Sequence, residues 1–316
     1  MVRWLAALAF APWFIQPAPA QEFPVKSVRI VVGFPPGGGA DLTARLISPK
    51  LNEAWARPVI IDNRPGAGGN LAADIVAKAP ADGYTLIVMP GPGAPSLYPN
   101  LPFDTRKDFA PITLAGRGPN VLVVHPSVPA ANVKELIALA RTRAGGLNYA
   151  SSGIGITPHL SAELFRKMAK VNIVHVPYKG AGPAVSDLVG GHVDLMIVSI
   201  PSVLGQIKGG RLKALGVTSL RRSPMLPEVP TLDQAGVPGY ESYQWWGLLA
   251  PAGTPPDIIV KLNSALVKAL NSPDVRKRYV DEGAEVVANS PAEFGDFFQK
   301  ELTKWDGLVV PGKAPL

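Results

Sequence analysis

The segment Val28-Arg29-Ile30-Val31-Val32-Gly33-Phe34-Pro35-Pro36-Gly37-Gly38-Gly39-Ala40-Asp41 contains the unit from which this chain is built. Its first part, Val28–Phe34, is a nearly continuous apolar and β-branched run, typical of a strand that is buried on both faces of a sheet. The prolines and glycines that follow predict a turn, and a helix is expected to begin near Asp41. A strand, a glycine-rich turn and a helix in this order favour an α/β fold.

The same alternation continues to the end of the chain, because short apolar runs are separated by segments with helical periodicity. Three helix starts are readable: Ser290 with Glu293 as a capping box, Thr254 as an N-cap before Pro255, and Asn132 with Glu135. Repeated strand and helix predict a mainly parallel sheet. The further predicted strands are Val59–Asp62, Thr85–Met89, Val121–Val124, Ile173–Val176, Val193–Val198, Leu212–Val217 and Gly247–Ala250.

Length and composition limit the class of protein. With 316 residues the chain is larger than a usual single core, so it forms either two compact lobes or one large α/β domain. The hydrophobic fraction of 47% with 17% charged residues describes a globular protein. The net charge of +7 is spread along the chain, with Arg276-Lys277-Arg278 as its densest run, and this favours a solvated basic surface over nucleic-acid binding.

The first twenty residues have the features of a secretory signal peptide. Arg3 gives a positive start, Trp4–Ile15 is apolar, and Ala18-Pro19-Ala20 is a small-residue cleavage site before Gln21. The apolar stretch is too short to span a bilayer, for which about 20 residues are needed. The chain has no cysteine, which excludes disulfides and a lipid-bearing cysteine. We therefore expect an exported protein without a lipid anchor.

The loop from Phe34 to Gly39 is the first candidate ligand site, since open α/β sheets bind ligands where a strand passes into a helix. Backbone N–H groups of Gly37, Gly38 and Gly39, near a helix start at Asp41, would hold a carboxylate without an arginine. Phe34 and Asp41, on either side of these glycines, are candidate ligand contacts as well. The alternative is a plain strand-to-helix turn. The loop lacks the spacing of a dinucleotide-binding motif and has no Gly-Lys-Ser/Thr sequence, so no nucleotide cofactor is expected.

Several other residues are candidates for contacts with the same ligand. Ser151, Ser152 and Gly153 end a strand, and Thr157 with Pro158 opens a helix, so hydroxyl and N–H donors meet there. Thr157 acting only as an N-cap is the alternative. Three single residues complete the set: His159, which also fits a packing role, Tyr178, which offers an aromatic wall, and Gly91 in the stiff Met89–Pro95 run.

No motif of a known enzyme class is present. The chain lacks His-Glu-x-x-His, Gly-x-Ser-x-Gly and any cysteine nucleophile, and its four histidines lie far apart in sequence. We therefore expect no catalytic residues, no metal site and no cofactor. An exported hydrolase of small carboxylate esters or amides stays open as an alternative, and a buried Ser–His pair across a cleft would identify it.

Eight motifs, arriving in one order across the whole chain after residue 21, resemble the tripartite tricarboxylate transporter substrate-binding receptors, also called Bug receptors. They begin with Gly33-Phe34-Pro35-Pro36-Gly37-Gly38-Gly39 and continue with Asp62-Asn63-Arg64-Pro65-Gly66-Ala67-Gly68-Gly69, Ala81-Asp82-Gly83-Tyr84-Thr85-Leu86, Lys107-Asp108-Phe109-Ala110-Pro111-Ile112, Tyr149-Ala150-Ser151-Ser152-Gly153, Val174-His175-Val176-Pro177-Tyr178-Lys179-Gly180, Leu226-Pro227-Glu228-Val229-Pro230-Thr231 and Ala250-Pro251-Ala252-Gly253-Thr254-Pro255.

The resemblance implies a type II periplasmic-binding-protein (Venus flytrap) fold, with two α/β lobes joined by two crossing strands. It implies lobe one at residues 21–121 plus 225–316 and lobe two at 122–224. It also implies a monomeric periplasmic receptor that binds a small carboxylate between the lobes and delivers it to the membrane subunits of a transporter. A di- or tricarboxylate, an acidic amino acid and an aromatic carboxylate all fit, and an orphan receptor with a sensing role is an alternative.

Overall fold

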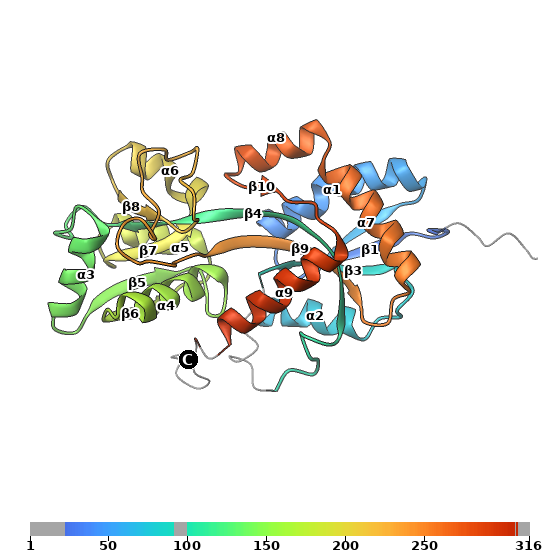
Figure 1. Cartoon of the computed structure of the whole chain (residues 1–316), viewed down its shortest axis with the longest axis horizontal. Coiled ribbons are helices and arrows are strands. Elements are labelled where there is room, and N and C mark those ends of the chain that lie inside the picture. The colour runs from blue at the N-terminus through green and yellow to red at the C-terminus, as the bar shows by residue number, and fades with distance from the viewer. Residues whose placement is uncertain (1–22, 92–99, 307, 309–316) are drawn as a thin grey trace, which may run out of the picture.

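The computed structural model describes residues 23–91, 100–306 and 308, so the predicted signal peptide at residues 1–20 lies outside the described residues. Figure 1 shows two α/β lobes side by side, with β4 (Phe109–Val124) and β9 (Tyr243–Pro251) running from one lobe into the other. We call these two paired strands the crossing ribbon. The predicted architecture of two α/β lobes joined by two crossing strands is confirmed.

Lobe one is built on a mixed sheet in which β1 lies between β2 and β3, parallel to both. β9 pairs with β3 and with β4, antiparallel to each, and β10 pairs with β4. The strands other than the crossing ribbon are β1 (Val28–Val32), β2 (Val59–Asn63), β3 (Thr85–Pro90) and β10 (Glu285–Val286).

Lobe two repeats this plan. β5 lies between β6 and β7, parallel to both, while the last residues of β4 run antiparallel to β7 and β8. The prediction of a mainly parallel sheet is therefore wrong, because a chain that crosses between lobes and returns adds antiparallel strands to each sheet. The strands are β5 (Leu147–Ser151), β6 (Ile173–Pro177), β7 (Leu195–Ser199) and β8 (Lys213–Val217).

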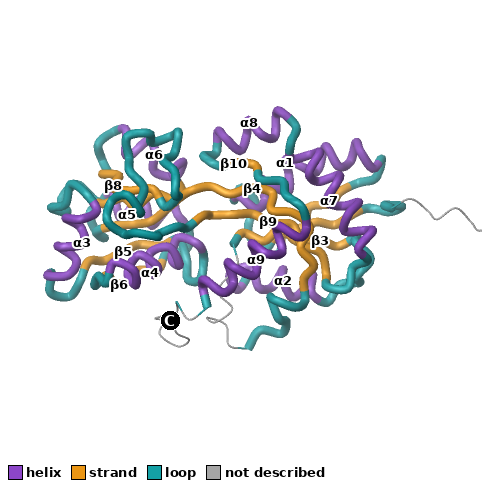
Figure 2. Tube along the Cα trace, in the orientation of Figure 1, coloured by secondary structure: helices purple, strands orange, loops and turns teal. Residues whose placement is uncertain are grey.

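Helices cover both faces of each sheet, as strands that are apolar on both sides require (Figure 2). In lobe one, one face carries α1 (Gly39–Trp55), α7 (Pro256–Leu270) and α8 (Pro273–Asp281), and the other carries α2 (Asn70–Ala77) and α9 (Pro291–Trp305). In lobe two, one face carries α3 (Val133–Thr142) and α4 (Thr157–Ala169), and the other carries α5 (Ala181–Val189) and α6 (Ile200–Lys208).

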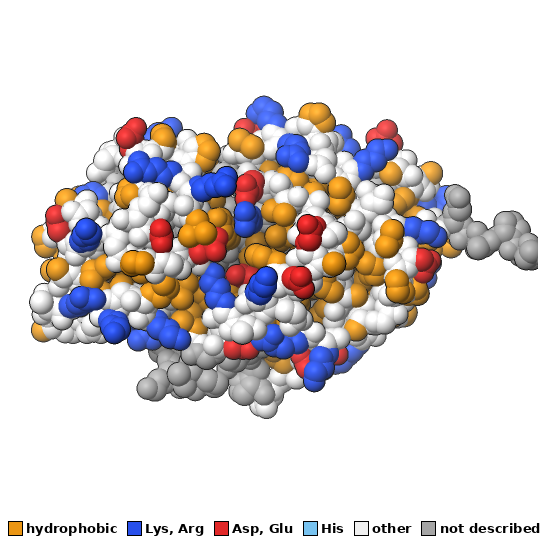
Figure 3. Space-filling view, in the orientation of Figure 1, with side chains coloured by type: hydrophobic (Ala, Val, Ile, Leu, Met, Phe, Trp, Pro, Cys, Tyr) orange, Lys and Arg blue, Asp and Glu red, His pale blue; other side chains and the backbone are white. Residues whose placement is uncertain are grey.

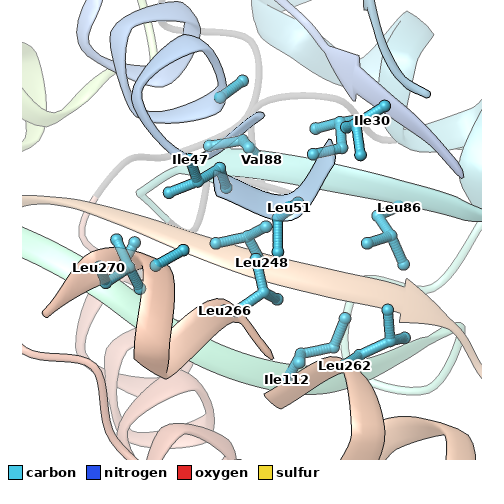
Figure 4. Close-up of a cluster of buried hydrophobic side chains, with 14 of the residues drawn as sticks. Ile30, Ile47, Leu51, Leu86, Val88, Ile112, Leu248, Leu262, Leu266 and Leu270 are labelled. Carbon is cyan, nitrogen blue, oxygen red and sulfur yellow. The ribbon is translucent and has the colours of Figure 1, made fainter. Parts of the chain in front are cut away.

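Figure 4 shows the larger core of lobe one, where side chains of α1 and α7 meet alternate side chains of the sheet. Ile47, Leu51 and Leu266 are fully buried against Ile30 and Leu248. Burying one such side chain contributes about 1.5–3 kcal/mol. The cleft loops are thus attached to a rigid frame.

The helix starts test the sequence interpretation directly. Ser290 accepts from Glu293 N–H in a full capping box, and Asn132 accepts from Glu135 N–H, as predicted. The third prediction is wrong: the N-cap of α7 is Pro255, and the Thr254 hydroxyl donates to Pro251 O instead. Thr254 lies one residue before the N-cap, and proline at the N-cap itself offers no side-chain acceptor to the helix N–H groups.

The return to lobe one was predicted at residue 225. However, Leu232, Val237 and Tyr240 pack into a core of lobe two, and pairing with lobe one begins at Tyr243. We propose that the second boundary lies near residue 242 instead.

Helix α9 is a third connection between the lobes. It packs on the lobe-one sheet through Phe294 and Phe298, while at its other end Trp305 packs against Leu160 of α4. Lys304 Nζ also donates to Glu241 O, just before β9, at 2.5 Å. The lobes are therefore joined by two strands and one helix end (Figure 1).

Candidate functional site

A narrow pocket lies between the lobes, where β1, β2, β3 and β5 pass into the segments that follow them. Its volume is about 40 Å³, which is space for roughly three water molecules. None of the lining residues that the structure describes is Lys, Arg, Asp or Glu. We call it the interlobe pocket, and it is lined by Gly33, Phe34, Gly68, Gly69, Asn70, Ala73, Ile87, Met89, Pro90, Gly91, Phe103 and Thr105 of lobe one and by Gly155, Ile156, Thr157 and Leu160 of lobe two.

Two helices begin at this pocket, one from each lobe. α2 starts at Asn70 behind Gly69, whose φ of 96° places it in the left-handed region, and α4 starts at Thr157 behind Ile156. Neither helix has a side-chain cap. Asn70 N–H donates to Ala67 O in the preceding turn, but the other first-turn N–H groups lack intrahelical partners and carry partial positive charge, so both helix ends favour an anion in the space between them.

Thr157 was predicted both as a ligand contact and, alternatively, as an N-cap. It is the first residue of α4 rather than its cap, and its side chain lies on the interlobe pocket. A Cβ atom placed on Gly91 would lie 2.9 Å from Thr157 Oγ1. The two lobes therefore touch at this point, and Phe34, Gly91 and Thr157 are the predicted residues that the pocket brings together. Of the Met89–Pro95 run, Pro92–Pro95 lie outside the described residues.

The glycine loop, residues 35–39, lies beside this pocket, and none of its residues is among the lining residues. Gly37 N–H donates to Asp41 Oδ2 at 3.0 Å, and Asn63 Nδ2 donates to Asp41 Oδ1 at 2.9 Å. Burial would raise the pKa of Asp41, but hydrogen bonds from Arg45, Gly37 and Asn63 outweigh it and hold the pKa below its usual value. The Asp41 carboxylate therefore holds the loop at the start of α1. Because Gly37 N–H already donates to it, this N–H group is not free for a ligand.

The other two loop glycines differ in their surroundings. A Cβ atom on Gly38 would meet nothing within 4 Å, whereas one on Gly39 would lie 2.4 Å from the ring of Trp246. Close contact with that indole explains why position 39 needs glycine. Gly38 faces open space, so its backbone is accessible.

The predicted lobe-two residues other than Thr157 are not among the lining residues of the pocket. Ser151 Oγ is 2.6 Å from His175 Nε2 and 2.9 Å from Gly153 O, to which it donates. His159 is buried and its Nδ1 accepts from Gly155 N–H, a pocket residue, at 3.1 Å. The Ser152 carbonyl accepts from Gly180 N–H. Of these contacts, the one between His159 and Gly155 reaches a lining residue of the pocket.

Tyr178 points to its own lobe. Its hydroxyl donates to Asp187 Oδ2 at 2.7 Å. Burial, together with the neighbouring Asp187 carboxylate, raises the pKa of Tyr178 to about 12. The hydroxyl is thus committed within lobe two.

The three rings of Tyr149, His175 and His159 form a stack inside lobe two. The centroids of the two imidazoles are 4.2 Å apart, and Tyr149 lies 4.8 Å from His175. Burial and the neighbouring His159 lower the pKa of His175 to about 3. A neutral His175 whose Nε2 carries the proton can donate to Ser151, which in turn donates to Gly153 O.

The Ser151–His175 pair is the feature that would favour a hydrolase. Both residues come from adjacent strands of one lobe, not from opposite sides of the cleft. The ring faces of His175 are stacked and its pKa is far below that of a general base working near neutral pH. The pair is therefore suited to fixing the loop after β5.

Gly68, Gly69, Asn70, Phe103 and Thr105 line the pocket but were not predicted from the sequence as ligand contacts. A usable signal existed, because β2 is followed by glycines and an apolar helix, as β1 is. Among the described residues, no group of three His, Asp or Glu side chains could hold a metal ion. Within the same residues, no helix is both long and apolar enough to cross a bilayer.

Comparison with known proteins agrees with this geometry. Residues 43–311 match the family model described as the tripartite tricarboxylate transporter family receptor. Protein BugT of Bordetella pertussis is 38% identical over 305 residues, which cover 95% of this chain and 93% of BugT.

Two solved structures are similar over their whole length. Rpa4515 of R. palustris, determined with adipate, is 39% identical with a TM-score of 0.79, covering 91% of this chain and 97% of that one. MatC from Rhodopseudomonas palustris, determined with bound malate, is 38% identical with a TM-score of 0.78, covering 90% and 99%. The predicted periplasmic-binding-protein fold is confirmed by these similarities and by other solved receptors of this kind.

Proposed function

The chain belongs to the tripartite tricarboxylate transporter receptor family, and from this premise we propose that it binds a small dicarboxylate between its lobes and delivers it to the membrane subunits of a transporter. The family consists of solute-binding receptors, and the chain is a receptor rather than an enzyme. We further propose that it acts in the periplasm as a monomer, after removal of residues 1–20.

One observation carries the proposal: two uncapped helix starts, those of α2 and α4, face the same pocket from opposite lobes. A dicarboxylate has an anionic group for each helix start and a hydrocarbon chain for the apolar walls, among them Phe34 and Leu160. The N–H groups of Gly38 and Gly39 and the hydroxyls of Ser152 and Thr157 are further donors in our proposal. Adipate and malate, found with two relatives, have this chemistry.

Residues of both lobes line the interlobe pocket, and this suggests a mechanism. In our proposal the lobes move apart for ligand entry and close over the ligand. The ligand contacts both lobes in the closed form but only one lobe in the open form. Ligand binding therefore shifts the equilibrium between the two forms toward the closed form. The closed form is then what a membrane partner recognises.

Calorimetry on the chain from Gln21 onward tests this function, with malate, citrate and adipate as ligands and adipamide as the uncharged control of the same shape. We expect one carboxylate to bind and remain chemically unchanged, while adipamide does not bind. Absence of binding by all three acids, or turnover of one, would contradict the proposal.

A pair of glycine variants tests the place of binding. Gly38→Leu projects into open space, so the fold should persist while access to the loop N–H groups is lost. Gly205→Leu on exposed α6, where a Cβ atom also meets nothing within 4 Å, is the matched control. Equal affinity in the two variants would exclude the glycine loop from the site.

A further inference from the structure

A second and larger pocket lies between the lobes and shares no residue with the interlobe pocket. Its volume is about 520 Å³. Lobe one contributes β4, α8 and β10, lobe two contributes the segment after β8, and the start of β9 closes one side. We call it the ribbon pocket, and it is lined by Arg117, Pro119, Ser219, Leu220, Arg221, Arg222, Ser223, Pro224, Met225, Glu241, Tyr243, Val280, Gly283, Ala284 and Glu285.

The ribbon pocket and the glycine loop have no residue in common. Successive side chains of a strand point to opposite faces, so Tyr243 and Trp246, three residues apart on β9, face opposite ways. Trp246 lies against Gly39, whereas Tyr243 lines the ribbon pocket. A ligand in the ribbon pocket would therefore contact none of the loop glycines that are proposed to grip the carboxylate.

The charges around the ribbon pocket leave cations available. Arg117 is taken, since its Nε donates to Glu285 at 2.7 Å and its guanidinium lies 4.5 Å from the centroid of the Tyr243 ring. Arg222 Nη1 donates to Pro227 O. Arg221 is exposed, and its guanidinium has no hydrogen bond or ion pair to any residue that the structure describes. Arg221, Arg222 and one remaining carboxylate residue, Glu241, thus line the pocket.

Apolar side chains line the pocket beside these arginines. Leu220 is 49% exposed and Val280 is 65% exposed, and they stand on opposite lobes. Met225 and Pro224 continue this wall. Figure 3 shows basic and hydrophobic side chains next to each other at the junction of the lobes. Exposed apolar side chains gathered around a cavity are typical of a binding site.

We propose that the ribbon pocket is a second ligand site, which binds a small organic anion with an apolar body. The guanidinium groups of Arg221 and Arg222 bind the anionic group, because a planar fork of N–H donors matches an oxyanion. Leu220, Met225 and Val280 cover the hydrocarbon part. This site is additional to the interlobe pocket and does not depend on the function proposed above.

The test uses 1-anilinonaphthalene-8-sulfonate, an anion with an apolar body, titrated by fluorescence against the chain from Gln21 onward with no carboxylate present. The charge variant is R221E with R222E, and its control is K208E with R211E, which are exposed in lobe two outside the pocket. The steric variant is Val280→Trp, and its control is Val260→Trp on α7, where the native valine is 63% exposed.

We expect the charge variant and the steric variant each to weaken binding of the probe at least tenfold, while both controls stay within twofold of the native chain. Unfolding temperature and circular dichroism identify any variant that does not fold. Native affinity in both folded pocket variants, or an equal loss in the controls, would overturn the proposal. None of these substitutions lies in the interlobe pocket, so failure here leaves carboxylate binding there untouched.

Discussion

The indole N–H of Trp245, in the crossing ribbon, donates to Glu301 Oε2 of α9 at 3.0 Å. The same oxygen accepts from the indole N–H of Trp305, also at 3.0 Å, and all three side chains are largely buried. One carboxylate thus joins the ribbon to the helix that reaches lobe two. It satisfies two buried donors that would otherwise lack partners.

We expect Glu301→Ala to lower the free energy of unfolding by about 2–4 kcal/mol, because two buried N–H groups lose their acceptor. Glu301→Gln retains an acceptor and should cost roughly half as much. Urea denaturation measures both. Asp296→Ala, an exposed position on the same helix, is the control and should change stability by less than about 0.5 kcal/mol. A similar loss in all three variants would show that the carboxylate does not have this role.

The buried histidine stack makes stability depend on pH. His175 has a folded pKa of about 3 against an ordinary value of 6.5, so between these values the unfolded chain binds a proton that the folded chain does not. Stability should therefore fall as pH drops from 6.5 toward 3. In His175→Gln this fall should be shallower, whereas His192→Gln, at an exposed site, should follow the native chain. Thermal unfolding at pH 7.0 and 4.5 checks this, and parallel curves for all three proteins would contradict it.

The contact between Gly91 and Thr157 predicts an effect on ligand affinity. In Gly91→Ala the new methyl group would lie 2.9 Å from Thr157 Oγ1, which hinders closure. Gly253→Ala is matched, because φ is 79° at Gly91 and 81° at Gly253, while the nearest atom to a new Cβ at 253 lies 3.8 Å away. Both should lose about 1–2 kcal/mol of stability from the left-handed backbone. Only Gly91→Ala should weaken carboxylate binding, roughly tenfold, by calorimetry.

Asn70 allows the charge preference of the interlobe pocket to be tested. Asn70→Asp places a carboxylate at the start of α2, where it interacts well with the helix dipole and should stabilise the fold by about 0.3–1 kcal/mol. The same charge repels a carboxylate ligand, and affinity should fall at least tenfold (~1.4 kcal/mol). Thermal unfolding and calorimetry separate the two effects. Unchanged affinity would place the ligand carboxylates elsewhere.

Local signals in the sequence were sufficient for much of the fold. Caps such as Asn132 and Ser290 act within four residues, and apolar runs such as Val28–Val32 are recognisable alone. The first three quarters of β4, residues 109–120, were missed because Pro111, Gly116 and Pro119 interrupt the pattern that marks a strand. It is held instead by β9, which arrives more than 100 residues later.

The candidate site was harder to derive, because the partners of its residues come from other parts of the sequence. Sequence marks Gly37 as a backbone donor, yet the motif does not show that Asp41 accepts from it or that Asn63, at the end of β2, donates to the same carboxylate. Likewise, the Gly91–Thr157 contact depends on how the lobes meet. Thr157 could be found since it follows a strand end and precedes Pro158, a helix-start residue.

The end of α9 gives the molecule a third fixed point, displaced from the axis of the ribbon. Two strands can both bend and twist. A lobe that is attached only by two strands can therefore move in several directions relative to the other lobe. The anchorage of Trp305 on Leu160 and of Lys304 on Glu241 restrains the twisting component and leaves bending along one arc. Because the lobes can move in fewer directions, ligand binding restricts less lobe motion, and the entropic cost of binding is smaller.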